Sequence, residues 1–208
     1  MTDATPRTQL EQAIGGWRGA LESALPALAF LLTYQFTGRD LSWAVRAAAG
    51  VALIAALIRV VRRGSLQFVI SGVIGVAVSA WLVSRTGQAK DYFVPGLLTN
   101  VAWGTAYLVS ILVRYPIIGI FVGSLEGEPL KWIRDPERRR VATTATWLWV
   151  ALFAGRLAIE LPLYFAGALN ALGAAKLLLG WPPYVLVVWL SYRLMKPWFG
   201  SAPAEDLL

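Results

Sequence analysis

The chain alternates between apolar stretches of about 20 residues and short polar segments that hold most of its charges. An α-helix rises about 1.5 Å per residue, so a stretch of this length crosses a hydrocarbon core of about 30 Å. The pattern predicts an all-α fold, a polytopic membrane helix bundle with six transmembrane helices. The predicted spans are residues 20–37, 42–61, 65–84, 92–113, 141–168 and 172–194.

These spans form one transmembrane domain, residues 20–196. It is preceded by a polar tail with a short amphipathic lead-in, residues 1–19, and followed by a second tail, residues 197–208. The fifth span is long enough to tilt, or to break near Pro162.

The composition supports the same class. Of the 208 residues, 57% are hydrophobic and 15% are charged, and the mean hydropathy is +0.59. A soluble domain is normally about a quarter charged. The absence of Cys and His excludes disulfides, thiolate nucleophiles, Cys/His zinc sites and histidine-ligated haem. We expect no metal and no cofactor.

Lys and Arg are distributed unevenly between the two sides of such a bundle. The first 20 residues carry both signs of charge, unlike a signal peptide, which favours a cytoplasmic N-terminus. With six spans, 13 of the 19 basic residues then lie on the inner side, five on the outer side, and Arg156 within a span. Because cytoplasmic loops are enriched in Lys and Arg, both termini are predicted to be cytoplasmic. Topology thus explains the net charge of +7, and we expect no nucleic-acid partner.

The cytoplasmic loop, residues 114–140, has an apolar and a basic part. Residues 115–125 (YPIIGIFVGSL) are too few to span, so they form a re-entrant segment, an interfacial helix or an extension of the fourth helix. The basic part should lie on anionic lipids of the inner leaflet, where each basic residue contributes about 1 kcal/mol of attraction. Its basic residues are Lys131, Arg134, Arg138, Arg139 and Arg140.

Small residues and prolines predict packing faces and kinks. In the third span, Ser71, Gly75 and Ser79 recur every four residues, a spacing that lets another helix approach closely. Prolines interrupt the hydrogen bonds of a helix, and the resulting kinks either shape the bundle or expose backbone groups to an ion or substrate. The predicted kinks are at Pro162 in the fifth span and at Pro182 and Pro183 in the sixth.

Two opposite charges, Arg156 and Glu160, lie one helical turn apart in the fifth span. A charge near the middle of a span costs at least about 2.5–3.5 kcal/mol, and residues at this spacing can pair and share that cost. Three interpretations remain open. The two residues form a buried ion pair, face a water-filled cavity, or both reach the interface on a shifted helix.

The fourth span carries a polar or small stripe at helical spacing. The stripe consists of Asn100, Gly104, Tyr107, Ser110 and Arg114. Glu160 and Asn100 lie about 12 and 13 Å from the outer surface, so Asn100 can bind Glu160 or Arg156 if the stripe faces the fifth span. The hypothesis is an outward-facing polar site. Its candidate residues are Arg156, Glu160, Asn100, Tyr107 and Arg46.

No motif in the sequence indicates catalysis. Of the 12 acidic residues, only Glu22 and Glu160 lie within predicted spans, and the chain has no Ser–His pair, metal-ligand cluster or Gly-rich phosphate loop. We therefore expect no enzyme. Two classes remain: a small transporter or permeation protein for an unidentified molecule or ion, and a non-transporting scaffold for envelope or division processes. A scaffold would bind a second copy or an envelope protein.

Four parts of the chain carry a family resemblance: IGGWRGALESALPALAFLL, TGQAKDYFVPGLLTN, LVRYPIIG and the tail GRLAIELPLY…LLLGWPPY…WLSYRL. They resemble an actinobacterial multi-pass membrane family known as a domain of unknown function, from about Ala13 to Leu194. ALPALAFLLTY and DYFVPGLLTNVAWGTAYLVSILVRYPIIG are similar, more distantly, to the intracellular septation protein A family, small inner-membrane proteins linked to envelope integrity and division. The fifth and sixth spans lie outside this second resemblance. The resemblance implies a bacterial cytoplasmic membrane and supplies no catalytic residues.

Overall fold

The computed structural model of the protein describes residues 16–61, 66–125, 127 and 130–199. Every regular element in this part of the chain is a helix, which confirms the all-α prediction. Most of the two predicted tails, residues 1–19 and 197–208, lies outside the described residues. The described residues divide into two compact units.

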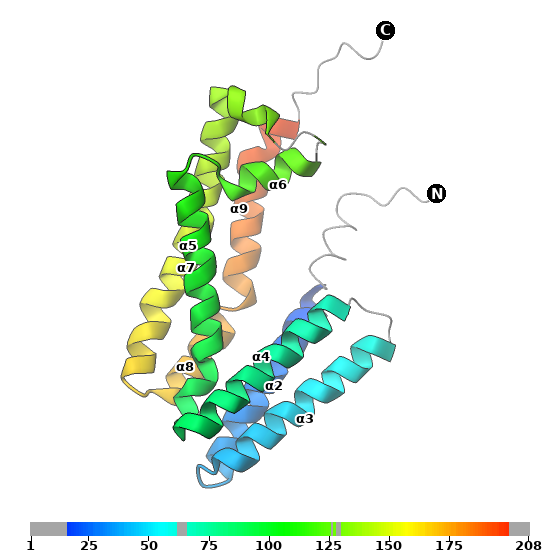
Figure 1. Cartoon of the computed structure of the whole chain (residues 1–208), viewed down its shortest axis with the longest axis vertical. Coiled ribbons are helices and arrows are strands. Elements are labelled where there is room, and N and C mark those ends of the chain that lie inside the picture. Colours follow the sequence, from blue (N-terminus) through cyan, green and yellow to red (C-terminus); the bar gives the residue numbers. More distant parts are fainter. Residues whose placement is uncertain (1–15, 62–65, 126, 128–129, 200–208) are drawn as a thin grey trace. The chain divides into compact units, whose positions relative to one another are not determined.

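The first unit contains the described residues up to Gly96 together with Leu163–Leu177. Three antiparallel helices run through it, with α3 in contact with both α2 and α4, and the short 3₁₀ helix η1 packs against α4 (Figure 1). The elements are α2 (Gly16–Phe36), α3 (Leu41–Val61), α4 (Leu66–Thr86), η1 (Ala89–Phe93) and α8 (Leu169–Leu178).

Aromatic rings and small residues build the core of this unit. The ring of Phe30 on α2 stacks on Tyr92 of η1, with centroids 4.1 Å apart. Ala44 on α3 is fully buried, and its small side chain fits beside these rings. Gly173 lies where α8 meets α2, because a Cβ at this position would collide with the side chain of Leu31.

The second unit contains Leu97–Pro162 and the described residues from Leu178 onward. Three long helices lie side by side in it, and two short elements cover one end of them (Figure 1). The elements are α5 (Val94–Leu112), α6 (Ile117–Leu125), η2 (Lys131–Arg134), α7 (Pro136–Phe165) and α9 (Trp181–Phe199). The 30 residues of α7 give a helix about 45 Å long, which exceeds the thickness of a hydrocarbon core.

A sharp turn separates α5 from α6. Arg114 has a left-handed backbone (φ 64°), and the N–H of Tyr115 donates to the carbonyl of Ser110 at 2.9 Å, as at a helix C-cap. The Ser110 hydroxyl accepts the N–H of Ile117 at 3.3 Å and so satisfies a free donor at the start of α6. Of the three alternatives for residues 115–125, the extension of the fourth helix is therefore wrong, and the re-entrant and interfacial alternatives remain.

Four stretches of the described part are long and apolar enough to cross a membrane, which indicates a membrane protein. They are Leu41–Ile58, Ala89–Leu112, Pro136–Phe165 and Leu169–Lys196. Shorter apolar helices at Leu25–Phe36 and Val73–Thr86 coincide with the first and third predicted spans. The count of six spans, and the side on which each end lies, remain predictions.

The predicted kinks at Pro182 and Pro183 differ from the structure. The sixth predicted span is two helices, α8 and α9, and the break lies at residues 179–180. Pro182 and Pro183 belong to the first turn of α9, where the missing proline N–H has no partner to lose. They begin a helix instead of bending one. Pro162 lies within α7, which continues past it to Phe165, so the alternative of a broken helix is not found and the kink at Pro162 stays a prediction.

Candidate functional site

Glu160 is the most deeply buried acid of the described chain, with no exposed surface. It lies on α7, and its Oε2 accepts a hydrogen bond of 3.0 Å from Nδ2 of Asn100 on α5. Asn100 is itself 4% exposed. The contact expected between the fourth-span stripe and Glu160 is thus present, and it joins α5 to α7 by a charge-assisted hydrogen bond.

Arg156 lies one turn before Glu160 on the same face of α7. Its Nη2 is 3.5 Å from Oε1 of Glu160, and its side chain is 9% exposed. The guanidinium lies over the ring of Tyr184 on α9, with Cζ 5.3 Å from the centroid, an attractive cation–π distance. The Nε atom of Arg156 is buried and has no hydrogen-bond partner among the described residues.

The ion pair between Arg156 and Glu160 is long, and it does not satisfy every hydrogen-bond donor of the guanidinium. Charge-assisted N–H···O hydrogen bonds measure about 2.7–2.9 Å, and an unsatisfied buried donor costs about 1–3 kcal/mol. Nε lies on the same edge of the guanidinium as Nη2, and this edge binds carboxylates and phosphates through two parallel hydrogen bonds. Glu160 uses only half of it. Arg156 therefore keeps hydrogen-bonding capacity that its neighbours do not use.

An aromatic cluster lies next to the charges. Tyr107 on α5 stacks on Trp149 and Phe153 of α7, with centroids 5.5 and 5.8 Å apart, and Tyr184 meets both rings edge-on. The indole N–H of Trp149 donates to the hydroxyl of Ser191 on α9 at 3.2 Å. The cluster gives the polar contacts an apolar surrounding, in which an ionic interaction is stronger than in water.

Gly104 allows the two helices to approach beside this cluster. A Cβ at Gly104 would lie 3.1 Å from the Cβ of Phe153. Gly104, Asn100 and Tyr107, which their spacing puts on one stripe, therefore all face α7.

No described contact joins Arg46 to these residues. It lies on α3 in the first unit, is exposed, and places its guanidinium 5.2 Å from the centroid of the Trp43 ring. Its assignment to the polar site has no support from the described contacts.

The structure describes only part of the packing face predicted in the third span. Ser79 is 6% exposed, but a Cβ on Gly75 would meet no described atom within 4 Å. The close approach expected at Gly75 is not found among the described residues, and the side chain of Ser71 lies outside them.

The basic loop residues lie at one end of the second unit. Lys131 and Arg134 belong to η2, and Arg138 belongs with Arg139 and Arg140 to the first turns of α7. This helix begins at Pro136, five residues before the predicted span, because Asp135 caps it by accepting the N–H groups of Glu137 and Arg138.

Two contacts of this structure were not predicted from the sequence. Tyr184 lies near the middle of the sixth predicted span and directly follows two prolines that were assigned to a kink, so nothing in the pattern connected it with Arg156. In the first unit, the hydroxyl of Tyr164 donates to Oδ1 of the buried Asp91 at 2.7 Å, and Lys90 lies over the Tyr164 ring. This second contact joins the end of α7 to η1.

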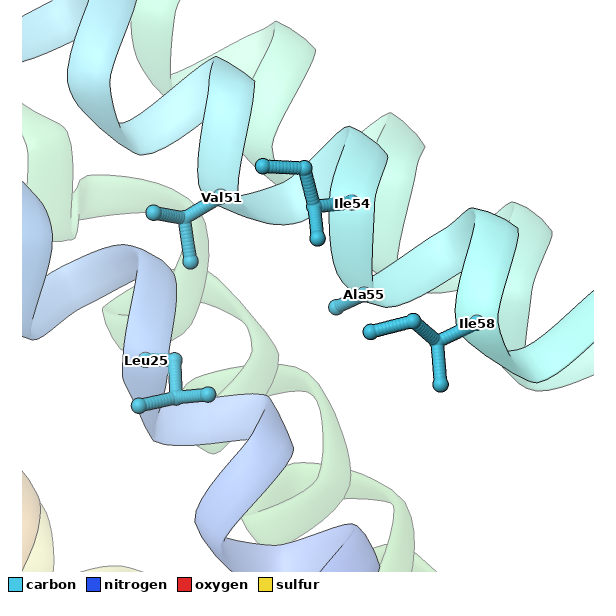
Figure 2. Close-up of a pocket in the computed structure, with 5 residues that line it drawn as sticks. All are labelled: Leu25, Val51, Ile54, Ala55 and Ile58. Atoms are coloured by element: carbon cyan, nitrogen blue, oxygen red, sulfur yellow. The ribbon is translucent and has the colours of Figure 1, made fainter.

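An apolar hollow of about 120 Å³ lies between α2 and α3. Figure 2 shows Leu25 of α2 facing side chains of α3 across it. All the lining residues are aliphatic: Leu25, Val51, Ile54, Ala55 and Ile58. The hollow offers no group that binds a charged or polar ligand. In the described part of the chain, no group of three acidic residues could hold a metal ion either.

Residues 14–199 match the model of a family described as "protein of unknown function (DUF3159)". The chain belongs to the DUF3159 family. This agrees with the resemblance to a domain of unknown function, whereas the actinobacterial origin and the septation likeness remain predictions. No curated protein and no solved structure matches the chain.

Proposed function

We propose that this DUF3159 protein is a multi-pass protein of a bacterial cytoplasmic membrane that binds a small anion at Arg156 and lets it pass through the bilayer. It has six spans and both termini in the cytoplasm, so the site opens toward the outer side. The observation that carries the proposal is the incomplete pairing of Arg156, whose buried Nε has no hydrogen-bond partner among the residues that the structure describes.

Charged residues inside spans are costly and are usually functional. A pair that served only to lock helices would be expected to close tightly, whereas Glu160 lies 3.5 Å from Nη2. A carboxylate or phosphate that approaches Arg156 would accept hydrogen bonds from Nε and Nη2 together. The guanidinium is therefore the anion-binding group of the proposed site.

Glu160 then competes with the bound anion. Asn100 holds Oε2 of Glu160 at 3.0 Å, so the carboxylate stays beside Arg156 while the anion occupies Nη2. When the anion leaves, Oε1 pairs with Nη2 again. This internal competitor keeps binding weak, as permeation requires, because an ion that binds too tightly does not leave.

The proposal is tested by thiol accessibility in this naturally Cys-free chain. Tyr184→Cys places a thiol beside Arg156, and Asn100→Cys places one beside Glu160. Ile159→Cys is the matched control, because Ile159 is 46% exposed on α7 yet has no described polar contact. We expect a membrane-impermeant thiol reagent, added outside intact cells, to label positions 184 and 100 but not 159.

Inorganic phosphate or acetate in excess should slow labelling at position 184, and Arg156→Gln should abolish that protection. If positions 184 and 100 both stay unreactive from outside, the result would contradict the proposed site.

A scaffold is the second candidate, favoured by the contacts that tie three helices together. Asn100–Glu160 joins α5 to α7, and Trp149–Ser191 joins α7 to α9. In a scaffold for envelope or division processes, the combined change Arg156→Gln and Glu160→Gln leaves function intact, because removing both charges leaves no unpaired buried charge. In an anion-permeation protein the same double change abolishes activity while the protein still inserts.

A further inference from the structure

The short helix α6 presents two different faces. Ile118 and Val122 are buried, and a Cβ on Gly119 would lie 2.7 Å from Cζ2 of Trp132 and 2.9 Å from Cβ of Ala142. On the opposite face, the side chains of Phe121 and Leu125 are 62% and 68% exposed. One face of α6 is thus docked on η2 and α7, and the other is apolar and uncovered in the described part.

The position of α6 points to what covers this second face. α6 runs across the end of α5 instead of along it (Figure 1). Leu112, at the end of α5, is 70% exposed, and α5 and α7 are both apolar enough to cross a bilayer. A nine-residue helix is too short to cross one itself. An apolar face at the end of membrane-spanning helices belongs at the boundary between acyl chains and headgroups.

Basic side chains surround the same end of the unit. Residues 130–140 contain five basic residues and only two acidic ones. Of the acids, Asp135 already pairs with Arg138, at 3.6 Å, and caps α7. The remaining exposed arginines of this end are Arg114, Arg134, Arg139 and Arg140. The excess of positive charge complements anionic phospholipid headgroups.

Buried aromatic contacts fix this arrangement. Trp132 of η2 is 2% exposed and lies against Trp198 of α9, with centroids 6.0 Å apart, while the guanidinium of Arg138 lies over the Trp198 ring at 5.2 Å. These contacts hold η2 and the start of α7 beside α6. The apolar face and the arginines are therefore parts of one packed surface.

We propose that α6 and the segment of residues 130–140 form a binding surface for anionic phospholipids. Phe121 and Leu125 insert among the acyl chains, and Arg134, Arg139 and Arg140 bind the headgroup phosphates. With the predicted topology, this surface lies on the cytoplasmic leaflet. The surface is separate from Arg156 and does not depend on anion permeation.

The first test measures how phosphatidylglycerol stabilises the full-length protein in neutral detergent, with phosphatidylcholine as the reference lipid. We expect phosphatidylglycerol to raise the unfolding temperature of the wild type more than phosphatidylcholine does. In the variant Arg134→Gln/Arg139→Gln/Arg140→Gln, the apparent affinity for phosphatidylglycerol should fall about fivefold per arginine, about 100-fold in total.

The matched control removes three arginines elsewhere, Arg39→Gln/Arg46→Gln/Arg85→Gln, and should leave the phosphatidylglycerol response unchanged. Wild-type affinity in the Arg134/Arg139/Arg140 variant would overturn the proposal. So would an equal loss in the control, because it would show a general effect of net charge.

A second measurement does not require the arginine variants to fold. Ser124→Cys, next to Leu125 on the exposed part of α6, is labelled with a fluorophore, and the protein is placed in nanodiscs that contain phosphatidylglycerol. A quencher attached to lipid at headgroup depth should quench the label, and aqueous iodide should not. Quenching by iodide alone would show that α6 lies in water and that its apolar face does not contact lipid. This result would overturn the lipid assignment and favour a protein partner.

Discussion

The guanidinium of Arg156 is held by two different interactions and leaves one of its nitrogens without a partner in the described part of the chain. Nη2 contacts Glu160 at 3.5 Å, the flat face lies on the ring of Tyr184, and no described residue binds Nε. Glu160 is better satisfied, because each of its oxygens has a donor. The site is therefore asymmetric: both oxygens of the carboxylate have hydrogen-bond donors, whereas one N–H group of the guanidinium has no acceptor among the described residues.

This asymmetry leads to a prediction for the pair. Glu160→Gln should destabilise the protein by about 3–5 kcal/mol, because it leaves Arg156 as an uncompensated buried charge. Arg156→Gln should cost less than Glu160→Gln, since Glu160 keeps its hydrogen bond to Asn100. The double variant should be more stable than either single variant. Thermal unfolding in detergent measures the stability of the wild type, the two single variants and the double variant. Additive losses of stability in the double variant would rule out the pairing.

At the scale of elements, periodicity predicted the all-helical class and the residues that share one stripe of α5. Asn100, Gly104 and Tyr107 were predicted to share a stripe, and all three contact α7. Tertiary contacts were not predictable in this way. Tyr184 lies in a different predicted span from Arg156, and only packing brings the two together.

Helix boundaries depended on local backbone chemistry that the apolar pattern does not contain. The turn after α5 uses a left-handed arginine, a conformation that is uncommon outside glycine, so the sequence showed no obvious stop before Pro116. Pro182 and Pro183 were expected to bend a helix, but prolines suit a first turn equally well. Position within the helix decides between these roles, and composition does not report it.

The docking of α6 gives a prediction that compares two glycines. Gly119→Ala should destabilise the protein by about 1–3 kcal/mol, because its Cβ would overlap the Trp132 ring and Ala142. Gly155→Ala on α7 meets no described atom within 4 Å and should be neutral or stabilise by up to about 1 kcal/mol. Unfolding temperatures of the two variants check this. Equal effects would mean that α6 is not packed on Trp132.

At the scale of the whole molecule, the number of spans decides where the loops lie. The described part has four stretches long enough to cross a membrane, and two shorter apolar helices match the other two predicted spans. With four spans, the loop between α2 and α3 stays on the N-terminal side. With six spans, α2 crosses and this loop moves to the opposite side. The loop before α5 and helix α6 keep the same sides in both cases.

Three exposed positions therefore distinguish the two topologies: Thr37 in the loop after α2, Gln88 before α5 and Ser124 in α6. Each is changed to Cys and labelled in intact cells with an impermeant thiol reagent. We expect Thr37→Cys and Gln88→Cys to react and Ser124→Cys to react only after the cells are opened, because this places most Lys and Arg residues inside. Reaction at Gln88→Cys with protection of Thr37→Cys would instead mean four spans, with α2 and α4 lying against the membrane without crossing it. Reaction at Ser124→Cys in intact cells would invert the topology and move the proposed phospholipid surface to the outer leaflet.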